Sequence, residues 1–202
     1  MKSFRVNEIF SSIQGEGVRA GTPNLFLRFS GCNLKCSNED EYAGFNCDTE
    51  FASGRDLSIS EIIHELADVD HGKCKSIILT GGEPSLQIDS ELVSALKAAG
   101  YYLAIETNGT VVLPTDIDWV TVSPKSAEHT IVVRTANEVK YVRRKGQAIP
   151  RTVVTADHYL VSPAFEADGS LKRETLEWCL DLVKANPPWR LSLQLHKWLN
   201  IR

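Results

Sequence analysis

Apolar and polar positions along this chain form short apolar runs separated by amphipathic segments. Apolar runs bounded by turn residues predict strands. We assign strands to residues 24–29, 76–80, 101–105, 118–122, 139–142 and 191–195, and a further apolar run to 159–161. In the 191–195 stretch, apolar residues alternate with Ser192 and Gln194, which is the period of a strand.

Three segments between these runs have the spacing of helices. Ser58 and Glu61 form the signature of a capping box in front of an apolar stripe at helical spacing. The other two predicted helices are 91–99, ended by Gly100, and 174–184. Strands that alternate with helices predict a parallel α/β sheet, and three helices are too few for an eightfold barrel. We expect a trimmed, partly open parallel (β/α) barrel.

Composition narrows the class of protein. The 202 residues contain no linker and no fixed-period repeat, so we expect one domain spanning 1–202, with a homodimer covering its open edge. The net charge is −4 and the one compact basic run, 143–145, is short, which disfavours direct nucleic-acid binding. No apolar stretch is long enough to span a membrane, and no signal peptide precedes the first polar residues. We expect a cytoplasmic protein.

Three cysteines, Cys32, Cys36 and Cys47, are the strongest candidate chemistry. A reducing compartment makes disulfides between them improbable, whereas three thiolates can hold an iron-sulfur cluster and leave one iron without a protein ligand. A closed zinc site with a histidine as fourth ligand stays open as an alternative. Cys74 and Cys179 have no cysteine at ligand spacing and are expected to be incidental.

Polar clusters follow four of the predicted strands, at 80–83, 106–109, 123–125 and 162–163. Ligands of parallel sheets bind at the carboxyl ends of the strands, so these clusters should converge on one cleft. The Gly81-Gly82-Glu83-Pro84 segment offers backbone groups and a carboxylate to an ammonium group, although Gly-Gly at a strand end is more often only a turn.

A three-cysteine loop followed by a strand that ends in Gly-Gly-Glu-Pro resembles the radical S-adenosylmethionine (SAM) superfamily. Within it, the chain resembles the 7-carboxy-7-deazaguanine synthase family. The segments that carry this likeness are 13–17, 28–34, 47–49, 79–84, 106–110, 122–125 and 189–201. The resemblance implies a lyase that converts 6-carboxy-5,6,7,8-tetrahydropterin to 7-carboxy-7-deazaguanine with loss of ammonia, on the route to queuosine. It also implies a 4Fe-4S cluster, SAM as a regenerated cofactor, Mg²⁺, and an electron donor such as flavodoxin.

The resemblance also implies roles for single residues. The implied cluster ligands are Cys32, Cys36 and Cys47, with Thr49 as a magnesium ligand unless it merely caps a helix. The implied SAM-binding residues are Gly82, Glu83, Ser123, Pro124, Lys125, Ser162, Pro163, Ala164 and Phe165. The implied substrate-binding residues are Ile13, Gln14, Gly15, Glu16, Arg28, Thr80 and Arg202, from an N-terminal segment and from a C-terminal tail that closes the site. Glu106 and His196 are the candidates for proton handling.

Simpler explanations exist for several of these residues. Lys125 is also compatible with a solvated surface lysine, Gln14 and Glu16 with a glycine-rich loop tip, and His196 with a structural histidine. Arg28 has an independent argument, because a substrate carboxylate that leaves water needs a partner and a guanidinium can pair with it through two hydrogen bonds.

The chain departs from the family pattern at two places. Residues 37–46 are inserted before Cys47, and Ser162-Pro163 stands where relatives often carry Gln-Pro. Two other functions remain: a small radical SAM activase that installs a glycyl radical on a partner protein, and a zinc-stabilised binding module without catalysis. The activase would not need Gln14, Glu16 or Arg28.

Overall fold

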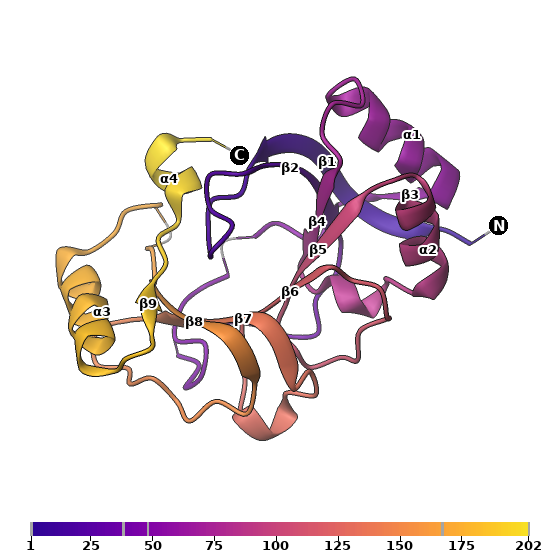
Figure 1. The fold of residues 1–202 in the computed structure, drawn as a ribbon. Coiled ribbons are helices and arrows are strands. Elements are labelled where there is room, and N and C mark those ends of the chain that lie inside the picture. Colours follow the sequence, from indigo (N-terminus) through magenta and orange to yellow (C-terminus); the bar gives the residue numbers. More distant parts are fainter. Residues whose placement is uncertain (1, 38, 48, 167, 202) are drawn as a thin grey trace.

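A computed structural model describes residues 2–37, 39–47, 49–166 and 168–201, and its strands form one sheet (Figure 1). Neighbouring strands follow the order β3-β1-β2-β4-β5-β6-β7-β8-β9. The strands are β1 Phe4–Ile13, β2 Pro23–Phe29, β3 Arg55–Leu57, β4 Ser76–Gly81, β5 Tyr102–Thr107, β6 Trp119–Val122, β7 Thr135–Arg143, β8 Thr155–Pro163 and β9 Arg190–Leu191.

The predicted parallel sheet is present from β2 to β9. Each neighbouring pair from β2 through β4, β5, β6, β7 and β8 to β9 is parallel. At the other edge, β1 pairs antiparallel with both β2 and β3, which the sequence did not predict. The end strands β3 and β9 do not pair in the described residues, so the sheet is a partly open barrel, as expected.

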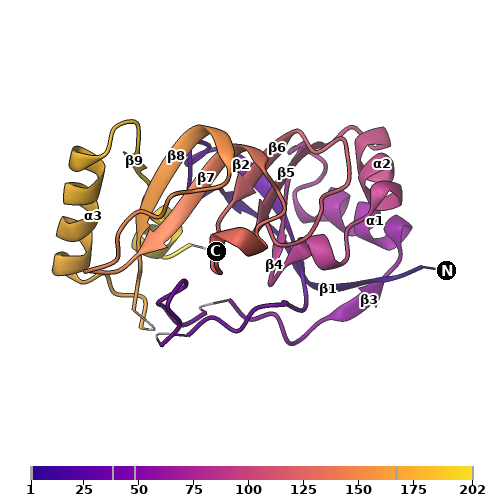
Figure 2. The ribbon, with the colours of Figure 1, turned by 90° about the horizontal axis from the view of Figure 1, so that it is seen from below.

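The main helices are α1 Ile59–Val69, α2 Ser90–Ala98, α3 Arg173–Ala185 and α4 Leu195–Leu199, and two short 3-10 turns are Pro84–Leu86 and Glu128–Thr130. Figure 2 shows α1 and α2 outside the sheet near one end and α3 outside it near the other. The capping box is confirmed, because the Ser58 side chain accepts from the Glu61 amide and Glu61 reaches back to Ser58. None of the helices described is long and apolar enough to cross a membrane.

The prediction of a strand over 191–195 is wrong in its second half. β9 ends at Leu191, and the chain then leaves the sheet and forms α4 from Leu195. The reason is tertiary: the Ser192 hydroxyl accepts a hydrogen bond from the Gly17 amide at 2.9 Å, and the Leu195 amide donates to the Gly15 carbonyl at 2.9 Å. The N-terminal segment therefore replaces a neighbouring strand as the partner of the tail.

Two hydrophobic clusters hold the sheet. The larger joins β1, β2, β4 and β5 to α1 and α2, and the smaller, around Tyr141, lies between β6, β7 and β8. Both are made of side chains with little or no exposure to solvent, whose burial is the main stabilising contribution to such a fold. The cavity described below is built on this support.

Candidate functional site

A large cavity of about 990 Å³ is lined by most of the candidate residues. Residues in the carboxyl-terminal halves of successive parallel strands, or just beyond these strands, line it, as expected for this class of sheet: Arg28, Thr80, Gly82, Glu106, Ser123 and Lys140. Its volume is at the upper end of the range for small-molecule sites, so it has room for two ligands side by side.

One side of the cavity, here called the cysteine wall, consists of residues 31–36, Cys47, Gly81 and Gly82. Its two sequence motifs are joined through the backbone, because the Glu83 amide donates to the Gly31 carbonyl at 2.9 Å. A Cβ atom at Gly82 would lie 2.2 Å from the Gly31 carbonyl oxygen and 2.8 Å from Cys32 Cβ. Glycine is therefore required at position 82 for the cysteine loop to approach the end of β4.

The thiols of Cys32, Cys36 and Cys47 all line this cavity. Among the residues that the structure describes, no three cysteine, histidine or acidic side chains are close enough to form a metal site as they stand. The three thiols influence one another electrostatically, and burial raises the pKa of both Cys32 and Cys36. Three unpaired thiols facing one cavity beside a glycine cradle fit an iron-sulfur cluster in donor type and number.

The insertion between Cys36 and Cys47 reaches the carboxyl end of β7. The Arg144 side chain donates to the Gly44 carbonyl at 2.6 Å, and the Arg143 side chain donates to the Tyr42 carbonyl at 3.4 Å. Figure 2 shows this loop running along one side of the sheet. Thr49 follows in a loop that lines the cavity, so it does not cap a helix.

Glu83 is nearly fully buried, with 1% of its surface exposed. Its carboxylate accepts hydrogen bonds from the Thr107 hydroxyl and the Asn108 amide, both at 2.7 Å, and from Ser85. It therefore joins the end of β4 to the end of β5 and does not itself line the cavity. The part of this motif that faces the cavity is Gly81 and Gly82.

Arg28 and Thr80 are neighbours in the β2–β4 ladder, and both line the cavity. The Arg28 Nε donates to Glu8 at 2.9 Å, and its guanidinium lies over the Phe10 ring. Within the described part of the chain its two Nη atoms donate no hydrogen bond. Half of the guanidinium is fixed by the protein, and the other half is available to an anion.

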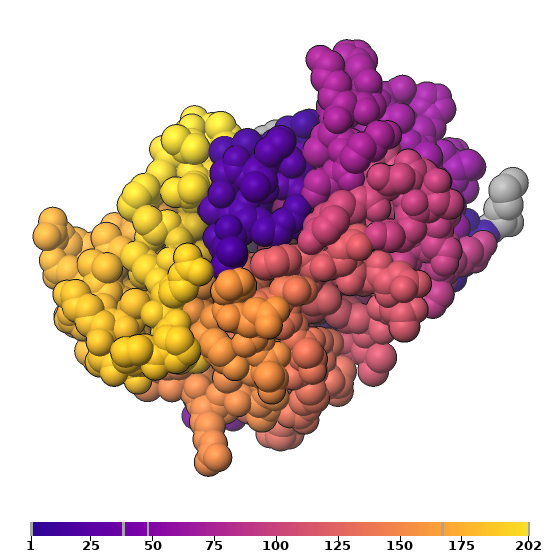
Figure 3. Space-filling model, in the orientation of Figure 1, coloured from indigo at the N-terminus to yellow at the C-terminus, as the bar shows by residue number. Residues whose placement is uncertain are grey.

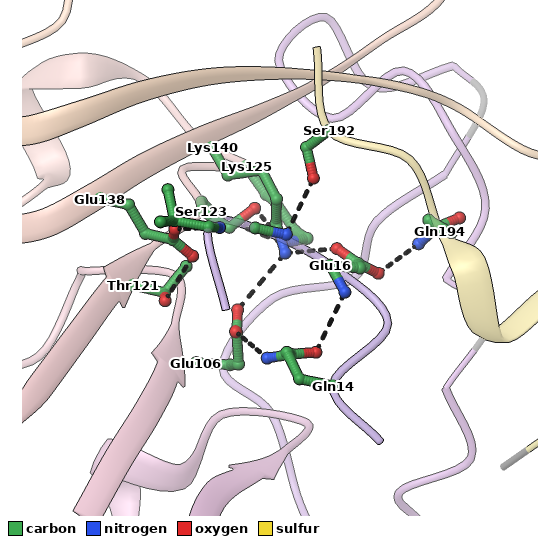
Figure 4. Close-up of polar contacts among 12 residues, drawn as sticks. Gln14, Glu16, Glu106, Thr121, Ser123, Lys125, Glu138, Lys140, Ser192 and Gln194 are labelled. Atoms are coloured by element: carbon green, nitrogen blue, oxygen red, sulfur yellow. Dashed lines mark hydrogen bonds and ion pairs between the residues drawn. The ribbon is translucent and has the colours of Figure 1, made fainter. Parts of the chain in front are cut away.

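The opposite side of the cavity, here called the carboxylate wall, consists of Gln14, Glu16, Glu106 and Lys140 (Figure 4). Lys140 forms ion pairs with Glu16 and, at 3.4 Å, with Glu106, while Gln14 Nε2 donates to Glu106 at 3.1 Å. Burial opposes ionisation of Glu16, but Lys140 outweighs it and lowers the pKa of Glu16 to about 2. Burial raises the pKa of Glu106, against the influence of Lys140.

The C-terminal tail packs against the N-terminal segment and completes this wall. Gln194 Nε2 donates to Glu16 at 2.6 Å, and a Cβ at Gly15 would lie 2.3 Å from His196 Nδ1. His196 lines the cavity together with Lys197 and Ile201. Figure 3 shows the indigo N-terminal segment lying against the yellow C-terminal tail.

The remaining candidates divide between the cavity surface and the layer behind it. Ile13, Ser123, Lys125 and Phe165 line the cavity, whereas four others are buried and do not line it: Pro124, Ser162, Pro163 and Ala164. The Ser162 hydroxyl is buried and has no hydrogen-bond partner among the described residues. Arg202 lies outside the residues that the structure describes.

Sequence reasoning missed Lys140, Gln194 as a partner of Glu16, and Glu138. Lys140 stands within the apolar stretch 139–142 that was assigned only as a strand. A lysine in an otherwise buried strand is the signal that was available, because lysine is almost never fully buried unless it is paired.

Comparisons with known proteins show the family of this chain. Residues 27–145 match the model of the Radical SAM superfamily. The chain is 43% identical over 198 residues to 7-carboxy-7-deazaguanine synthase of Bacteroides thetaiotaomicron, covering 98% of both chains. It is 37% identical to the protein of that name in Bradyrhizobium diazoefficiens, covering 99% of this chain and 100% of the relative.

A solved structure is similar in fold. The crystal structure of QueE from Escherichia coli superposes with a TM-score of 0.70 at 22% identity, over 96% of this chain and 95% of that one. At that identity the likeness concerns the fold, whereas the relatives above share the sequence over nearly their whole length. The chain therefore belongs to the radical SAM superfamily and, within it, to the 7-carboxy-7-deazaguanine synthase family.

Proposed function

We propose that this enzyme converts 6-carboxy-5,6,7,8-tetrahydropterin to 7-carboxy-7-deazaguanine and ammonia. The observation that supports the proposal is that one cavity is lined by three cysteines beside Gly82, by Arg28 and by the carboxylate wall. The reaction balances as loss of one ammonia from the pterin, so it needs no net oxidant. When bound, the cluster and SAM supply the carbon radical that removes a hydrogen atom from the substrate.

The cofactors belong at the cysteine wall. Cys32, Cys36 and Cys47 would hold the cluster, and the backbone at Gly82 would meet the amino group of SAM. Ser123, Lys125 and Phe165 line the same cavity and would contact the rest of SAM, with Pro124 and the 162–164 segment shaping the surface from behind. Glu83 supports this surface by joining β4 to β5.

The substrate belongs at the carboxylate wall and Arg28. The Nη atoms of Arg28 would pair with the substrate carboxylate, and Thr80 lies beside Arg28 in the ladder. The amino and ring N–H groups of the pterin are donors, and Glu16 and Glu106 are acceptors. Ile13, Gln14 and Gly15 would line the ring, and the terminal Arg202 is kept as a further proposed contact.

Proton handling is assigned to Glu106 and His196. Burial raises the pKa of Glu106 against the influence of Lys140, so this carboxyl group takes up a proton more readily than a solvated glutamate does. His196 lines the same cavity and lies next to Gly15. Both contact the space where the pterin would be bound.

The proposal also includes a magnesium ion, an electron donor and a homodimer. Thr49 offers a hydroxyl oxygen at the cavity, and Mg²⁺ would take its remaining ligands from substrate oxygens and water. A reduced flavodoxin would supply the electron, in the cytoplasm where the thiols stay reduced. The whole chain would act as one domain whose open edge is covered in a homodimer.

The test is an anaerobic incubation of the reconstituted protein with reductant, SAM and 6-carboxy-5,6,7,8-tetrahydropterin. We expect 7-carboxy-7-deazaguanine and ammonia in equal amounts, with SAM not consumed in proportion. An intact cluster that cleaves SAM but yields no deazaguanine would overturn the substrate assignment and leave the superfamily untouched.

A further inference from the structure

Lys140 is a buried lysine that has no role in the proposed reaction as described so far. It lies on β7, and only 6% of its side chain is exposed. Its ammonium group contacts Glu16, from the segment after β1, and Glu106, from β5. A lysine this deeply buried costs several kcal/mol in lost hydration unless its partners compensate, so its place in the cavity wall requires an explanation.

Lys140 is outnumbered by acidic groups. Glu138 lies two residues earlier on the same face of β7 and is 1% exposed, so three carboxylates surround one ammonium group. Figure 4 shows Glu16 and Glu106 on either side of Lys140, with Glu138 beside them. Without the lysine, like charges this close would not all stay ionised.

The three carboxylates are held differently. Glu138 accepts from the Thr121 hydroxyl and the Val18 amide, both at 2.9 Å, so the protein occupies both of its oxygens. Glu16 accepts from Lys140 on one oxygen and from Gln194 on the other. Each carboxylate oxygen has a second lone pair, so Glu16 keeps acceptor capacity on the cavity side.

We propose that Lys140 is a positioning residue for substrate binding: it acts through Glu16, which it holds ionised and directed at the donor edge of the bound pterin ring. This inference rests on the proposed function. Glu106 accepts a longer and weaker hydrogen bond from the same ammonium group, so Lys140 constrains Glu106 less than it constrains Glu16.

A merely structural role makes a different prediction. If Lys140 only ties residues 14–18 to β7, its loss weakens ligand binding equally at every pH. If it keeps Glu16 ionised, its loss lets Glu16 take up a proton as pH falls, and binding weakens most at low pH. The groups that act on Glu16 are Lys140, Gln194, His196 and Glu106, while Glu138 acts on Lys140. All but Lys140 are the same in the variant.

The test compares Lys140→Met with Lys145→Met, a matched change at an exposed lysine that pairs with Glu174. Reconstituted holoenzyme without reductant is titrated with 6-carboxypterin, the air-stable aromatic analogue, at about pH 6 and about pH 8. We expect Lys140→Met to bind roughly tenfold more weakly at the lower pH and about twofold more weakly at the higher pH, and Lys145→Met to match the wild type. Equal loss at both pH values, or no loss, would overturn the proposal.

If Lys140→Met does not fold, a second pair of variants tests the same proposal. The Glu16→Gln variant is compared with the Glu16→Gln, Lys140→Met double variant, in which fewer buried charges are left uncompensated. We expect their affinities to agree within about threefold, because Lys140 has lost the group through which it acts. A tenfold difference contradicts the proposal. Wild-type enzyme that forms no deazaguanine would instead count against the proposed function.

Discussion

The two walls of the cavity are built in opposite ways. The cysteine wall comes from two continuous motifs joined by backbone contacts, and its thiols face the cavity as free cysteines. The carboxylate wall comes from residues distant in the sequence, and its side chains are already bonded to one another through Lys140 and Gln194. The first wall is completed by its cofactor, whereas the second is preorganised by the fold.

The largest effect is expected at the cysteine wall. Cys32→Ala should abolish turnover and lower the iron content to background, because two thiols cannot hold the cluster. The protein should still fold, since Cys32 lies outside both hydrophobic clusters. Iron analysis and the visible absorption of reconstituted protein check this. Cys74→Ala is the control and should keep its iron, because Cys74 packs against the larger hydrophobic cluster and is not among the residues that line the cavity.

Arg28 tests the side of the cavity that meets the substrate carboxylate. Arg28→Ala should lower kcat/KM by roughly 100- to 1,000-fold, since an unpaired carboxylate would remain buried. Iron content and SAM binding should be unchanged, and Arg28→Lys should recover only part of the activity, because an ammonium group cannot pair with Glu8 and with a carboxylate through the planar geometry of a guanidinium. Loss of the cluster in Arg28→Ala would mean that the two walls are not independent.

Acid stability should reveal the preorganised wall. The pKa of Glu16 falls from 4.5 in the unfolded chain to about 2 in the folded protein, so Glu16 stabilises the fold above pH 4.5 and this stabilisation is lost as pH falls toward 2. The full effect is about 3 kcal/mol. Urea unfolding provides the test: between pH 5 and pH 3, the free energy of unfolding should fall less in Glu16→Gln than in the wild type. An equal fall in both proteins would disprove the assigned ion pair.

The smallest effect is expected from crowding the junction of the two motifs. In Gly82→Ala the added Cβ would meet the Gly31 carbonyl and Cys32 Cβ, so the cysteine loop must shift. We expect roughly tenfold weaker SAM binding, with the unfolding free energy lowered by about 1 kcal/mol. Titration of the reconstituted variant with SAM checks this, and unchanged affinity would show that Gly82 does not set the approach of the loop.

The same contrast explains what could be predicted from the sequence. Cys32, Gly82 and the Ser58 capping box belong to local motifs. Such motifs can be recognised in a sequence because their functional residues are only a few positions apart. The strand assignments for β2, β4 and β5 also follow from local apolar runs. The cysteine wall and most of the sheet were therefore predictable.

The carboxylate wall was not predictable in the same way. The role of Lys140 depends on its contacts with Glu16 and Glu106, which are 124 and 34 residues away in the sequence and come close to it only in the folded protein. β1 was missed because Asn7, Glu8, Ser11 and Ser12 interrupt its apolar pattern, and the strand also contains a bulge between Val6 and Glu8. α4 was mistaken for strand because the contacts of the tail with Gly15 and Gly17 override its alternating pattern.

Three thiols in this cavity are expected to hold a cluster and to leave one iron open to SAM. Electron paramagnetic resonance of the reduced, anaerobically reconstituted protein, with and without SAM, distinguishes this arrangement from a closed metal site. We predict roughly four irons per chain and a cluster spectrum that changes on addition of SAM. A protein that contains zinc and no iron, or a cluster whose spectrum does not change when SAM is added, would contradict the assignment of an open iron.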